Sequence, residues 1–579
     1  MNDASPGRLP CSPVQRLLSL AAIAAVPLFI LAASGCVEPH PTEPAAEAAP
    51  PAPPIDPDRI APLLPGMGDL SMKITTSVPL AQTFFNQGLV LSYGFNHAEA
   101  ARSFREAARL DPRCAMCWWG AALVLGPNIN MKMEADAAPA AWEALKKAQE
   151  LAPGASAPEQ DWIEALSHRY AEDAVEDRTS LDVAYADAMR ALAEKYPDDV
   201  NARVLMAEAL MDLHPWDFWD RDGRPREWTP EILEAIEAAM SMSPGHPGAN
   251  HFYIHAVEAS KDPDRALDAA GRLDAAVPGA GHLVHMPSHI YIRTGRYQQA
   301  IEANERAVAS DNEYVTQCHA QGIYPLGYMP HNRHFLWVSA TLAGNRATAF
   351  DAARGIAGSI DTQKMREEGL GTLQHYWSSP LWAWIRFDAW EEILAYPEPD
   401  EDLVYPRGVR RFARGMAMAS TGRLDEAAAE LAALKTLAAD PALEKVTIWD
   451  INNTTDLLAI AVEVLTGEIS AKQGDTATAI AHLRKGVALE DSLNYDEPPP
   501  WSNPVRENLG AVLIAAGKAG EAEKVYREDL ERFPENGWSL FGLEASLRAQ
   551  GKSAEADEVK ARFEKAWAHA DTTLTSSRL

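Results

Sequence analysis

Histidine is the residue type whose number and spacing in this sequence indicate chemistry. The chain of 579 residues contains 16 histidines, and an even distribution would place about two of them in any 84-residue stretch. Seven fall within one such stretch: His251, His255, His282, His285, His289, His331 and His334. Two pairs, His251/His255 and His285/His289, are spaced i, i+4, so the imidazoles of each pair share a helix face and can bind one metal ion. We therefore predict a metal site, with Glu258 as a candidate carboxylate ligand, catalytic acid or base, or hydrogen-bond partner of a ligand.

Imidazole ligation outside the cytosol suits copper or zinc more than iron. Zinc would imply hydrolysis or a structural clamp, whereas copper or iron would imply redox or oxygen chemistry. Three histidines per ion would leave an open coordination position and four would close it, so the number of ions stays open. The string HFYIH lacks the glutamate that follows the first histidine of a zinc-protease helix, which argues against that class. The alternative to a metal is a hydrogen-bonded structural stripe or a peptide-binding stripe.

Helical hairpins are the elements that must position these side chains. Residues 81–112 show two helical patterns, separated by a turn near 95–96 and ended by an Asp-Pro pair. The residues expected to pack this hairpin are Gly88, Ala100, Phe104, Ala107 and Pro112. The small residues let the two helices approach closely, while Phe104 fills the space between successive hairpins. In these features the segment resembles the tetratricopeptide repeat family.

Similar units recur along the chain. Central units start at Pro247, Gly281 and Pro330, and later units are marked by Gly415, Gly474, Gly510 and Gly551. The resemblance implies an all-α fold, namely an α-solenoid whose hairpins form a right-handed superhelix with long loops between some repeats. The strings NHFYIHAVEAS, HLVHMPSHIY and DPRCAMCWWG also resemble those of bacterial tetratricopeptide proteins of unassigned activity.

The resemblance also implies where the histidines point. In tetratricopeptide arrays the second, fifth and ninth places of the first helix line the concave surface. Counted from Pro247, Gly281 and Pro330, all seven histidines occupy such places. We therefore expect imidazoles from three consecutive hairpins, whose helix axes lie about 10 Å apart, to converge in the groove.

A CxxC pair, Cys114 and Cys117, stands at the start of another expected first helix. In an oxidising envelope compartment we expect a disulfide between the two residues. A soft metal site and two packed thiols are the alternatives.

Three clusters of proline and aromatic residues interrupt the repeats. They read HPWDFWDRDGRPREW from His214, GIYPLGYMPHNRHF from Gly322 and LNYDEPPPWSNP from Leu493. Their prolines exclude a continuous helix, so we expect loops. Beside a histidine-lined groove such loops would form lids or substrate walls, or else they pack between irregular hairpins. His375 is a lesser candidate for the same site.

The N-terminal residues predict a membrane-anchored envelope protein. Arg8 and Arg16 precede an apolar run over 17–32, and Ala33-Ser34-Gly35-Cys36 resembles a bacterial lipobox in which Cys36 is lipidated. A plain secretory signal is the alternative, and Val37 favours the outer membrane by resemblance to known sorting. The expected organisation is a signal peptide with lipobox at 1–36, a Pro/Ala-rich tether at 37–65, a repeat region at 66–400 with its histidine-rich centre at 247–350, and C-terminal repeats at 401–579.

Composition narrows the function classes further. The 82 acidic residues outnumber the 52 basic ones and give a formal charge of −30, which would repel a nucleic acid. The sequence has no glycine-rich phosphate loop, nucleophile elbow or dinucleotide fingerprint. Two classes remain. One is an envelope lipoprotein whose concave groove binds a protein or peptide and carries the metal site, and the other is a copper-, zinc- or iron-dependent envelope enzyme whose active site is the histidine cluster.

Overall fold

The computed structural model describes residues 58–318 and 323–578. The expected signal peptide, the lipobox with Cys36 and the first part of the tether lie outside the described residues. Pro57–Leu579 forms one compact unit. Among the described helices, none combines the length and the apolar character that crossing a bilayer requires.

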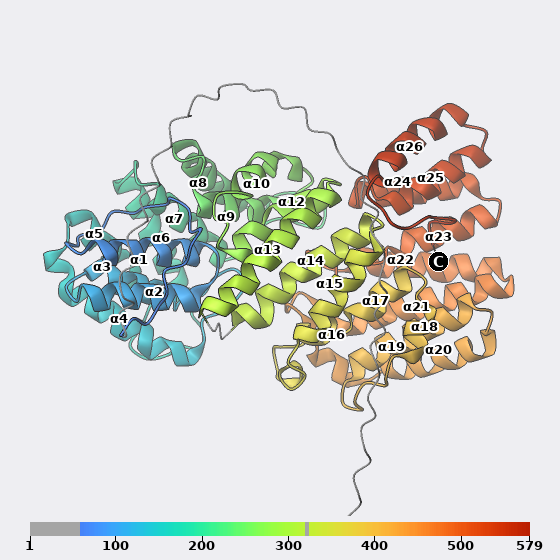
Figure 1. The fold of residues 1–579 in the computed structure, drawn as a ribbon, viewed down its shortest axis with the longest axis horizontal. Coiled ribbons are helices and arrows are strands. Elements are labelled where there is room, and N and C mark those ends of the chain that lie inside the picture. The colour runs from blue at the N-terminus through green and yellow to red at the C-terminus, as the bar shows by residue number, and fades with distance from the viewer. Residues whose placement is uncertain (1–57, 319–322, 579) are drawn as a thin grey trace, which may run out of the picture. The chain divides into compact units, whose positions relative to one another are not determined.

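The first part of the chain is built from helices joined by tight turns and by longer loops (Figure 1). The elements are α1 (Pro79–Tyr93), α2 (His97–Leu110), α3 (Ala115–Leu123), η1 (Ala135–Ala137), α4 (Ala138–Leu151), η2 (Ala152–Gly154), α5 (Ala157–Ser167), α6 (Thr179–Lys195), α7 (Val200–Asp212) and α8 (Thr229–Met242).

The central part carries the histidine-rich segment and a turn of π-helix, η4. The elements are α9 (Pro247–Glu258), η3 (Pro263–Ala266), α10 (Leu267–Leu273), α11 (Gly281–His285), α12 (Pro287–Arg293), α13 (Tyr297–Cys318), η4 (Tyr324–Tyr328), α14 (Met329–Leu342), α15 (Arg346–Ser359), η5 (Lys364–Arg366), α16 (Thr372–Trp377), α17 (Ser379–Arg386) and α18 (Trp390–Ala395).

The last part contains the longer hairpins and a small antiparallel sheet. The elements are α19 (Val404–Ser420), α20 (Leu424–Ala438), η6 (Pro441–Lys445), β1 (Thr447–Ile448), β2 (Asn452–Asn453), α21 (Thr454–Gln473), α22 (Thr476–Ser492), α23 (Val505–Ala515), α24 (Ala519–Arg532), α25 (Gly537–Ala549) and α26 (Ser553–Ala566). In the sheet, Thr447 pairs with Asn453 and Ile448 with Asn452.

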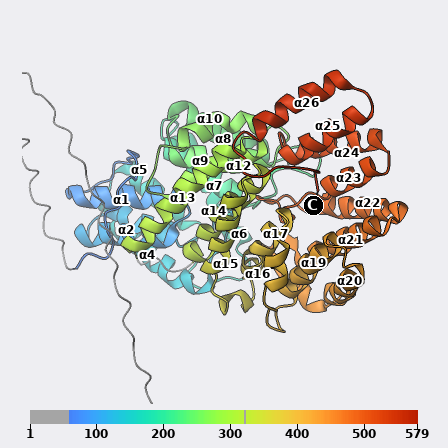
Figure 2. The same ribbon diagram turned by 45° about the vertical axis from the view of Figure 1, so that its right-hand side comes forward.

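Consecutive helices pack as hairpins, for example α1 with α2, α14 with α15, α21 with α22 and α25 with α26. Successive hairpins also contact each other, as α2 does with α3. In the same way α24 packs against α25 (Figure 2). The predicted all-α solenoid is therefore confirmed as the fold class.

Glycines provide the close approach that packs neighbouring hairpins. A Cβ added at Gly88 or Gly120 would lie 2.9 Å or 2.4 Å from the ring of Phe104. Phe104 thus fills the space between its own hairpin and the next, as the sequence predicts. Tyr526 does the same in a C-terminal hairpin, because a Cβ at Gly510 or Gly542 would lie 2.3 Å or 2.2 Å from its ring.

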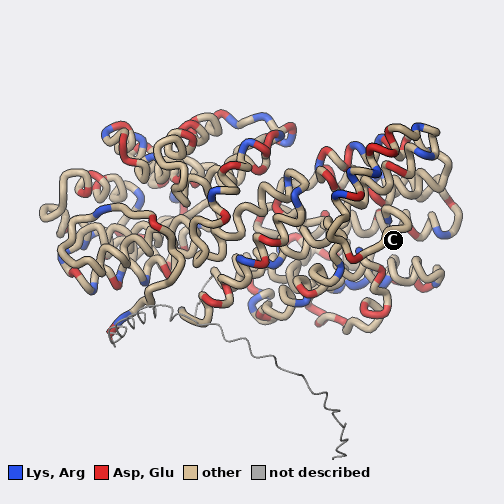
Figure 3. The backbone as a smooth tube through the Cα atoms, turned by 45° about the horizontal axis from the view of Figure 1, so that its top comes forward, with Lys and Arg blue, Asp and Glu red and all other residues tan. Residues whose placement is uncertain are grey.

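Two hydrophobic cores stabilise the compact unit. Buried residues between Ala61 and Met329 form the first core, and buried residues between Ile292 and Val559 form the second. The two cores therefore meet around α11, α12 and α14, where most of the predicted site histidines lie. Acidic and basic residues are interspersed along the described chain (Figure 3).

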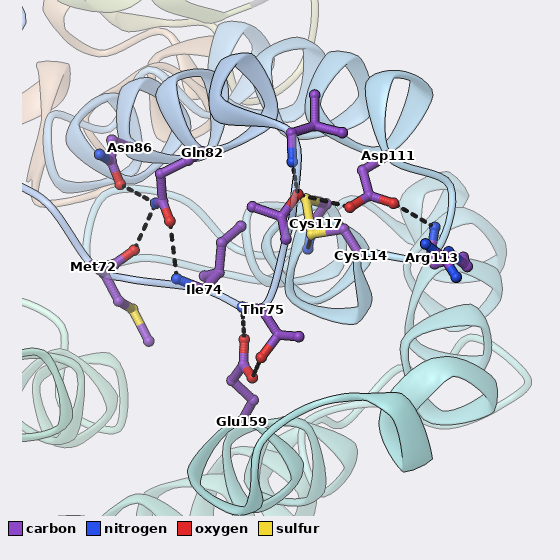
Figure 4. Close-up of a disulfide and its surroundings, with 12 residues drawn as sticks. Met72, Ile74, Thr75, Gln82, Asn86, Asp111, Arg113, Cys114, Cys117 and Glu159 are labelled. Carbon is purple, nitrogen blue, oxygen red and sulfur yellow. Dashed lines mark hydrogen bonds between the residues drawn. A yellow bond between two sulfur atoms is a disulfide. The ribbon is translucent and has the colours of Figure 1, made fainter.

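A disulfide joins Cys114 and Cys117 at the start of α3, and both cysteines are buried. The Sγ of Cys114 accepts a hydrogen bond from the backbone N–H of Cys117. Residues 72–76 run beside this disulfide (Figure 4). They are held by Glu159, which accepts a bond from the N–H of Thr75 at 2.5 Å, and by Gln82, which accepts from the N–H of Ile74 at 3.0 Å. The described residues before α1, including 58–65 of the expected tether, also pack: Ala61 is buried and the N–H of Leu64 donates to Gln87.

Candidate metal centre

Helices α9, α11, α12 and α14 carry the predicted site histidines. Helix α9 holds His251 and His255, and it packs against α12, which holds His289. Proline splits the first helix of the next hairpin, because Pro287 has no N–H to donate within a helix. Helix α11 consequently ends at His285 and α12 begins at Pro287. The imidazoles of His285 and His289 still meet across this break, with their Nε2 atoms 2.9 Å apart.

Six of the seven histidines come together as two groups of three. One group is His251, His255 and His282, and the other is His285, His289 and His331; within each group the candidate ligand nitrogens lie within 4.8 Å of one another. We call these six residues the histidine centre. His331 is half-buried, whereas each of the other five is at most 2% exposed. The centre is thus buried and reaches solvent on the side of His331.

Four of the six imidazoles form a hydrogen bond through Nδ1 to a group that is not one of the six histidines. The Nδ1 of His251 lies 2.5 Å from the carbonyl oxygen of Tyr93, and that of His285 lies 2.7 Å from Oδ1 of Asn304. Since a carbonyl and an amide oxygen are acceptors, each Nδ1 is the donor and each Nε2 keeps a lone pair. This is the arrangement that orients a metal-bound histidine.

The other two Nδ1 atoms share one carboxylate. The Nδ1 of His255 lies 2.8 Å from Oε1 of Glu258, and the Nδ1 of His289 lies 2.5 Å from Oε2. Burial by itself would raise the pKa of Glu258, but the adjacent His289 and the hydrogen bonds from both imidazoles hold it at about 2. Glu258 is therefore an ionised hydrogen-bond acceptor whose two oxygens are both occupied.

The inward-facing nitrogens lack protein partners. The Nε2 atoms of His251 and His255, both ring nitrogens of His282 and the Nδ1 of His331 are buried without a hydrogen bond. At His285 and His289, two Nε2 lone pairs at 2.9 Å would repel each other unless a proton or a metal cation lies between them. Two nitrogens on one tetrahedral zinc ion lie about 3.3 Å apart, which is close to this separation.

Burial keeps these imidazoles in the neutral form that binds metals. It lowers the pKa of His251, His282, His285 and His331 well below the ordinary value, and the neighbouring imidazoles lower each pKa further. At neutral pH their ring nitrogens therefore retain the lone pairs that a metal ion needs.

The structure places His334 apart from the other six histidines. A step of three residues along α14 turns a side chain by about 60° around the helix axis relative to His331. His334 consequently faces α16, where its ring lies 5.6 Å from that of His375 and 5.2 Å from that of Tyr376. His375 is also buried, with its Nδ1 2.8 Å from the hydroxyl of Tyr405. The two residues form a separate polar cluster beside the centre.

Aromatic residues in strained backbone conformations face the histidine centre. Among the described residues the non-glycine positions with positive φ are Phe95, Trp216, Asp388, Trp449, Asp450 and Glu535. The three aromatic members all contact the centre. The ring centroid of Phe95 lies 4.7 Å from that of His251, and that of Trp216 lies 5.1 Å from that of His255. The ring centroid of Trp449 lies 6.1 Å from that of His331. Such conformations cost about 1–3 kcal/mol each and concentrate at functional sites.

Two of the three segments predicted as loops contribute aromatic residues to these surroundings. Trp216 comes from the loop that starts at His214. The predicted loop from Gly322 is wrong for the described residues, because η4 continues directly into α14 and each of its two prolines stands in the first turn of its helical segment, where proline is tolerated. The ring of Tyr328, in η4, lies 4.9 Å from that of His282. The third loop contacts the first, because Arg221 donates to Asn494 at 3.1 Å. Trp449, at the turn between β1 and β2, was not singled out from the sequence because nothing local relates it to the histidines.

Asp496 and Glu497 are two further buried groups that sequence reasoning missed, although the loop containing them was recognised. Both are nine-tenths buried, and Oδ2 of Asp496 and Oε2 of Glu497 have no hydrogen-bond partner. Burial and the charge of Glu258 raise the pKa of Asp496 to about 8. Burial also raises that of Glu497 to about 8, although Arg293, whose Nε lies 3.9 Å from Oε1, opposes the shift. Both carboxyl groups are therefore protonated at neutral pH in the metal-free protein.

These raised pKa values predict a pH dependence of stability. The unfolded chain ionises such groups near pH 4, whereas the folded chain holds their protons up to about pH 8. The stabilisation is full below pH 4 and is lost as pH rises towards 8, by up to about 1.4 kcal/mol per pH unit for each carboxyl. The double substitution Asp496→Asn/Glu497→Gln should therefore flatten the fall in melting temperature of the metal-free protein between pH 5 and 8. Glu444→Gln, at an exposed acid, should leave the slope unchanged; equal slopes in all three proteins would contradict the assignment.

Comparison with known proteins agrees with this architecture. The family model of the tetratricopeptide repeat matches residues 285–314, which begin at His285 and continue through α12 into α13. This segment is therefore similar to one tetratricopeptide repeat, and helical hairpins pack on either side of it. No curated protein matches the sequence.

Several solved structures resemble the chain at low sequence identity. A human IFIT1 dimer with PPP-AAAA is 13% identical over 85% of this chain and 91% of that one, with a TM-score of 0.30. The Cut9-Hcn1 hetero-tetramer of the APC/C is 12% identical over 84% and 76%, with a TM-score of 0.28. The TPR domain of P58(IPK) is 11% identical over 82% and 99%, with a TM-score of 0.21. Similarities of this size say nothing about what this chain binds.

Proposed function

We propose that this tetratricopeptide-repeat protein binds transition-metal ions at the histidine centre and uses them for chemistry on a small substrate. The observation that carries the proposal is the convergence of buried nitrogen lone pairs without protein partners, including the Nε2 atoms of His285 and His289 at 2.9 Å. A bound cation would satisfy these lone pairs, and buried polar groups left unpaired are costly.

Several features favour an enzyme over a structural metal clamp. Each group provides three histidines, and three protein ligands leave a coordination position open for a substrate or water. Strained aromatic residues surround the centre, and strain of this kind is typical of functional sites. Bound copper would supply redox or oxygen chemistry, and bound zinc would supply an activated water or a polarised carbonyl. Copper and zinc suit an all-imidazole ligand set better than iron, whose dinuclear sites use carboxylates.

The residues of this chain have distinct roles in the proposal. The six histidines hold the ions, and Tyr93, Asn304 and Glu258 fix the orientation of the imidazoles through their Nδ1 atoms. The half-buried His331 and the neighbouring Trp449 mark the side from which a small substrate enters. Glu258 serves as a positioning residue, because both of its oxygens already accept hydrogen bonds.

A protein or peptide partner is compatible with this function. Tetratricopeptide solenoids present extended concave surfaces for such partners, and a partner there would not compete with ions at the five histidines that are at most 2% exposed. The lipobox-like residues before Cys36 support a location in the cell envelope, with the lipid on Cys36 as the membrane anchor.

Elemental analysis of the native protein lacking residues 1–36 tests the proposal. We expect at least one equivalent of copper, zinc or iron per chain, and a rise in melting temperature when metal-free protein is titrated with copper or zinc salts. Exogenous azide should perturb the absorption spectrum of a bound copper with an open position. A protein that contains no metal and whose melting temperature does not respond to added metal would refute the proposal.

A further inference from the structure

Resting on the proposed metal function, we infer that the histidine centre holds two metal ions and that Glu258 couples them. The inference concerns the number of ions and their mutual dependence, and it follows from the distances among the six imidazoles and from the hydrogen bonds of one carboxylate.

A single ion cannot take all six histidines. Ligand nitrogens bound at 2.0–2.1 Å to one ion lie at most about 4.2 Å from each other. The six residues do not form one set even at 4.8 Å; they separate into the group of His251, His255 and His282 and the group of His285, His289 and His331. Each group therefore offers three candidate ligands for an ion of its own.

The two sites are immediate neighbours. The rings of His255 and His289 lie 5.2 Å apart, and those of His282 and His285 lie 5.6 Å apart. Histidines of one site therefore contact histidines of the other. A third set, His255, Glu258 and His289, also has the spacing of a metal site. Its carboxylate oxygens are already occupied by the two Nδ1–H groups, so we assign it as the link between the sites.

Glu258 connects one member of each site through a different oxygen. Oε1 accepts from Nδ1 of His255 and Oε2 from Nδ1 of His289, and the carboxylate is fully buried. Each hydrogen bond fixes the tautomer that presents Nε2 as a lone pair. An ion bound at one site immobilises Glu258 and thereby orients the histidine of the other site, so the second ion binds to a pre-ordered partner.

Glutamine at this position makes the coupling testable, because an amide has one acceptor oxygen and one donor nitrogen. In Glu258→Gln, the imidazole that faces the amide oxygen keeps its Nδ1–H and its Nε2 lone pair. The imidazole that faces the NH₂ group must accept with Nδ1, and it then carries its hydrogen on Nε2, where it cannot bind a metal. One site should be lost and the other retained.

A matched control lies far along the chain. Glu463 accepts a hydrogen bond from Nδ1 of His482 at 2.6 Å, so it makes the same type of carboxylate–imidazole contact. Neither residue belongs to the groups that form the histidine centre. Glu463→Gln therefore changes the same chemistry without touching the sites.

The experiment loads metal-free protein with zinc or copper salts, removes unbound metal by desalting, and counts ions by elemental analysis and native mass spectrometry. We expect two ions per chain in the wild type and in Glu463→Gln, and one in Glu258→Gln. At half-saturating metal, wild-type protein should consist mainly of metal-free and two-ion species. Circular dichroism checks that each variant is folded.

The outcomes separate this inference from the proposed function. A wild-type protein that binds no metal refutes the proposed function itself. A wild type that binds one ion, a Glu258→Gln variant that keeps two, or a wild type that fills its sites one at a time would overturn the inference and leave the metal function standing. If Glu258→Gln does not fold, the wild-type count and the distribution of species at half saturation still decide the question.

Discussion

The double substitution His285→Ala/His289→Ala is expected to lower the metal content from two ions per chain to at most one. These residues provide two of the three imidazoles in their group, and their Nε2 atoms form the closest nitrogen contact of the centre. A single remaining histidine, His331, cannot hold a transition-metal ion against competing water and buffer. The measurement is elemental analysis after loading and desalting.

The control for this prediction is His482→Ala. His482 lies on α22, is partly exposed and pairs with Glu463. Its removal should leave the metal content unchanged, and the circular dichroism of both variants should match that of the wild type. Equal losses of metal from the two variants would show that the ions are bound elsewhere.

Phe104→Ala is expected to destabilise the fold strongly, by about 3–5 kcal/mol in the free energy of unfolding. The ring is fully buried and lies against Gly88 on its own hairpin and Gly120 on the next. Glycine cannot expand into the vacated space, so a cavity remains between the two hairpins. Chemical denaturation, with hydrogen exchange of the amides in α1, α2 and α3, would measure the effect.

Phe541→Ala provides the comparison for this core substitution. Phe541 lies on α25, is only partly buried and makes a ring contact with Phe563 at 5.7 Å. Its replacement should cost clearly less than that of Phe104. Similar losses at the two positions would mean that Phe104 does not join the hairpins as the structure indicates.

Much of the fold could be predicted from local sequence because a tetratricopeptide hairpin is a local structure. The positions of Gly88, Phe104 and Gly120 relative to one another follow from helical periodicity and the length of one repeat, and the structure places them in contact as expected. The break at Pro287 was less predictable, because a helix can continue past a proline with a kink when its neighbours hold it in place.

The candidate site was predictable only in part. Spacing along one helix shows that His251 and His255 share a face, but it does not measure the distance to imidazoles on other helices. For that reason His334 was grouped with the other six histidines, although the rotation along α14 turns it towards His375. Likewise, Trp449 and Asp496 lie more than 100 residues beyond the last site histidine, and no periodicity relates them to it.

The sequence by itself therefore determined the hairpin repeat, the helix faces that carry histidine and the acidic character of the chain, since these depend on residue type and on contacts between near neighbours. Only the tertiary structure decided which six imidazoles meet, and that Glu258 links His255 of one group to His289 of the other. It also decided that strained Phe95, Trp216 and Trp449 surround them. The physical reason is that these relations depend on the packing of one helix against another. The two hydrophobic cores determine that packing, and their residues come from many segments of the chain.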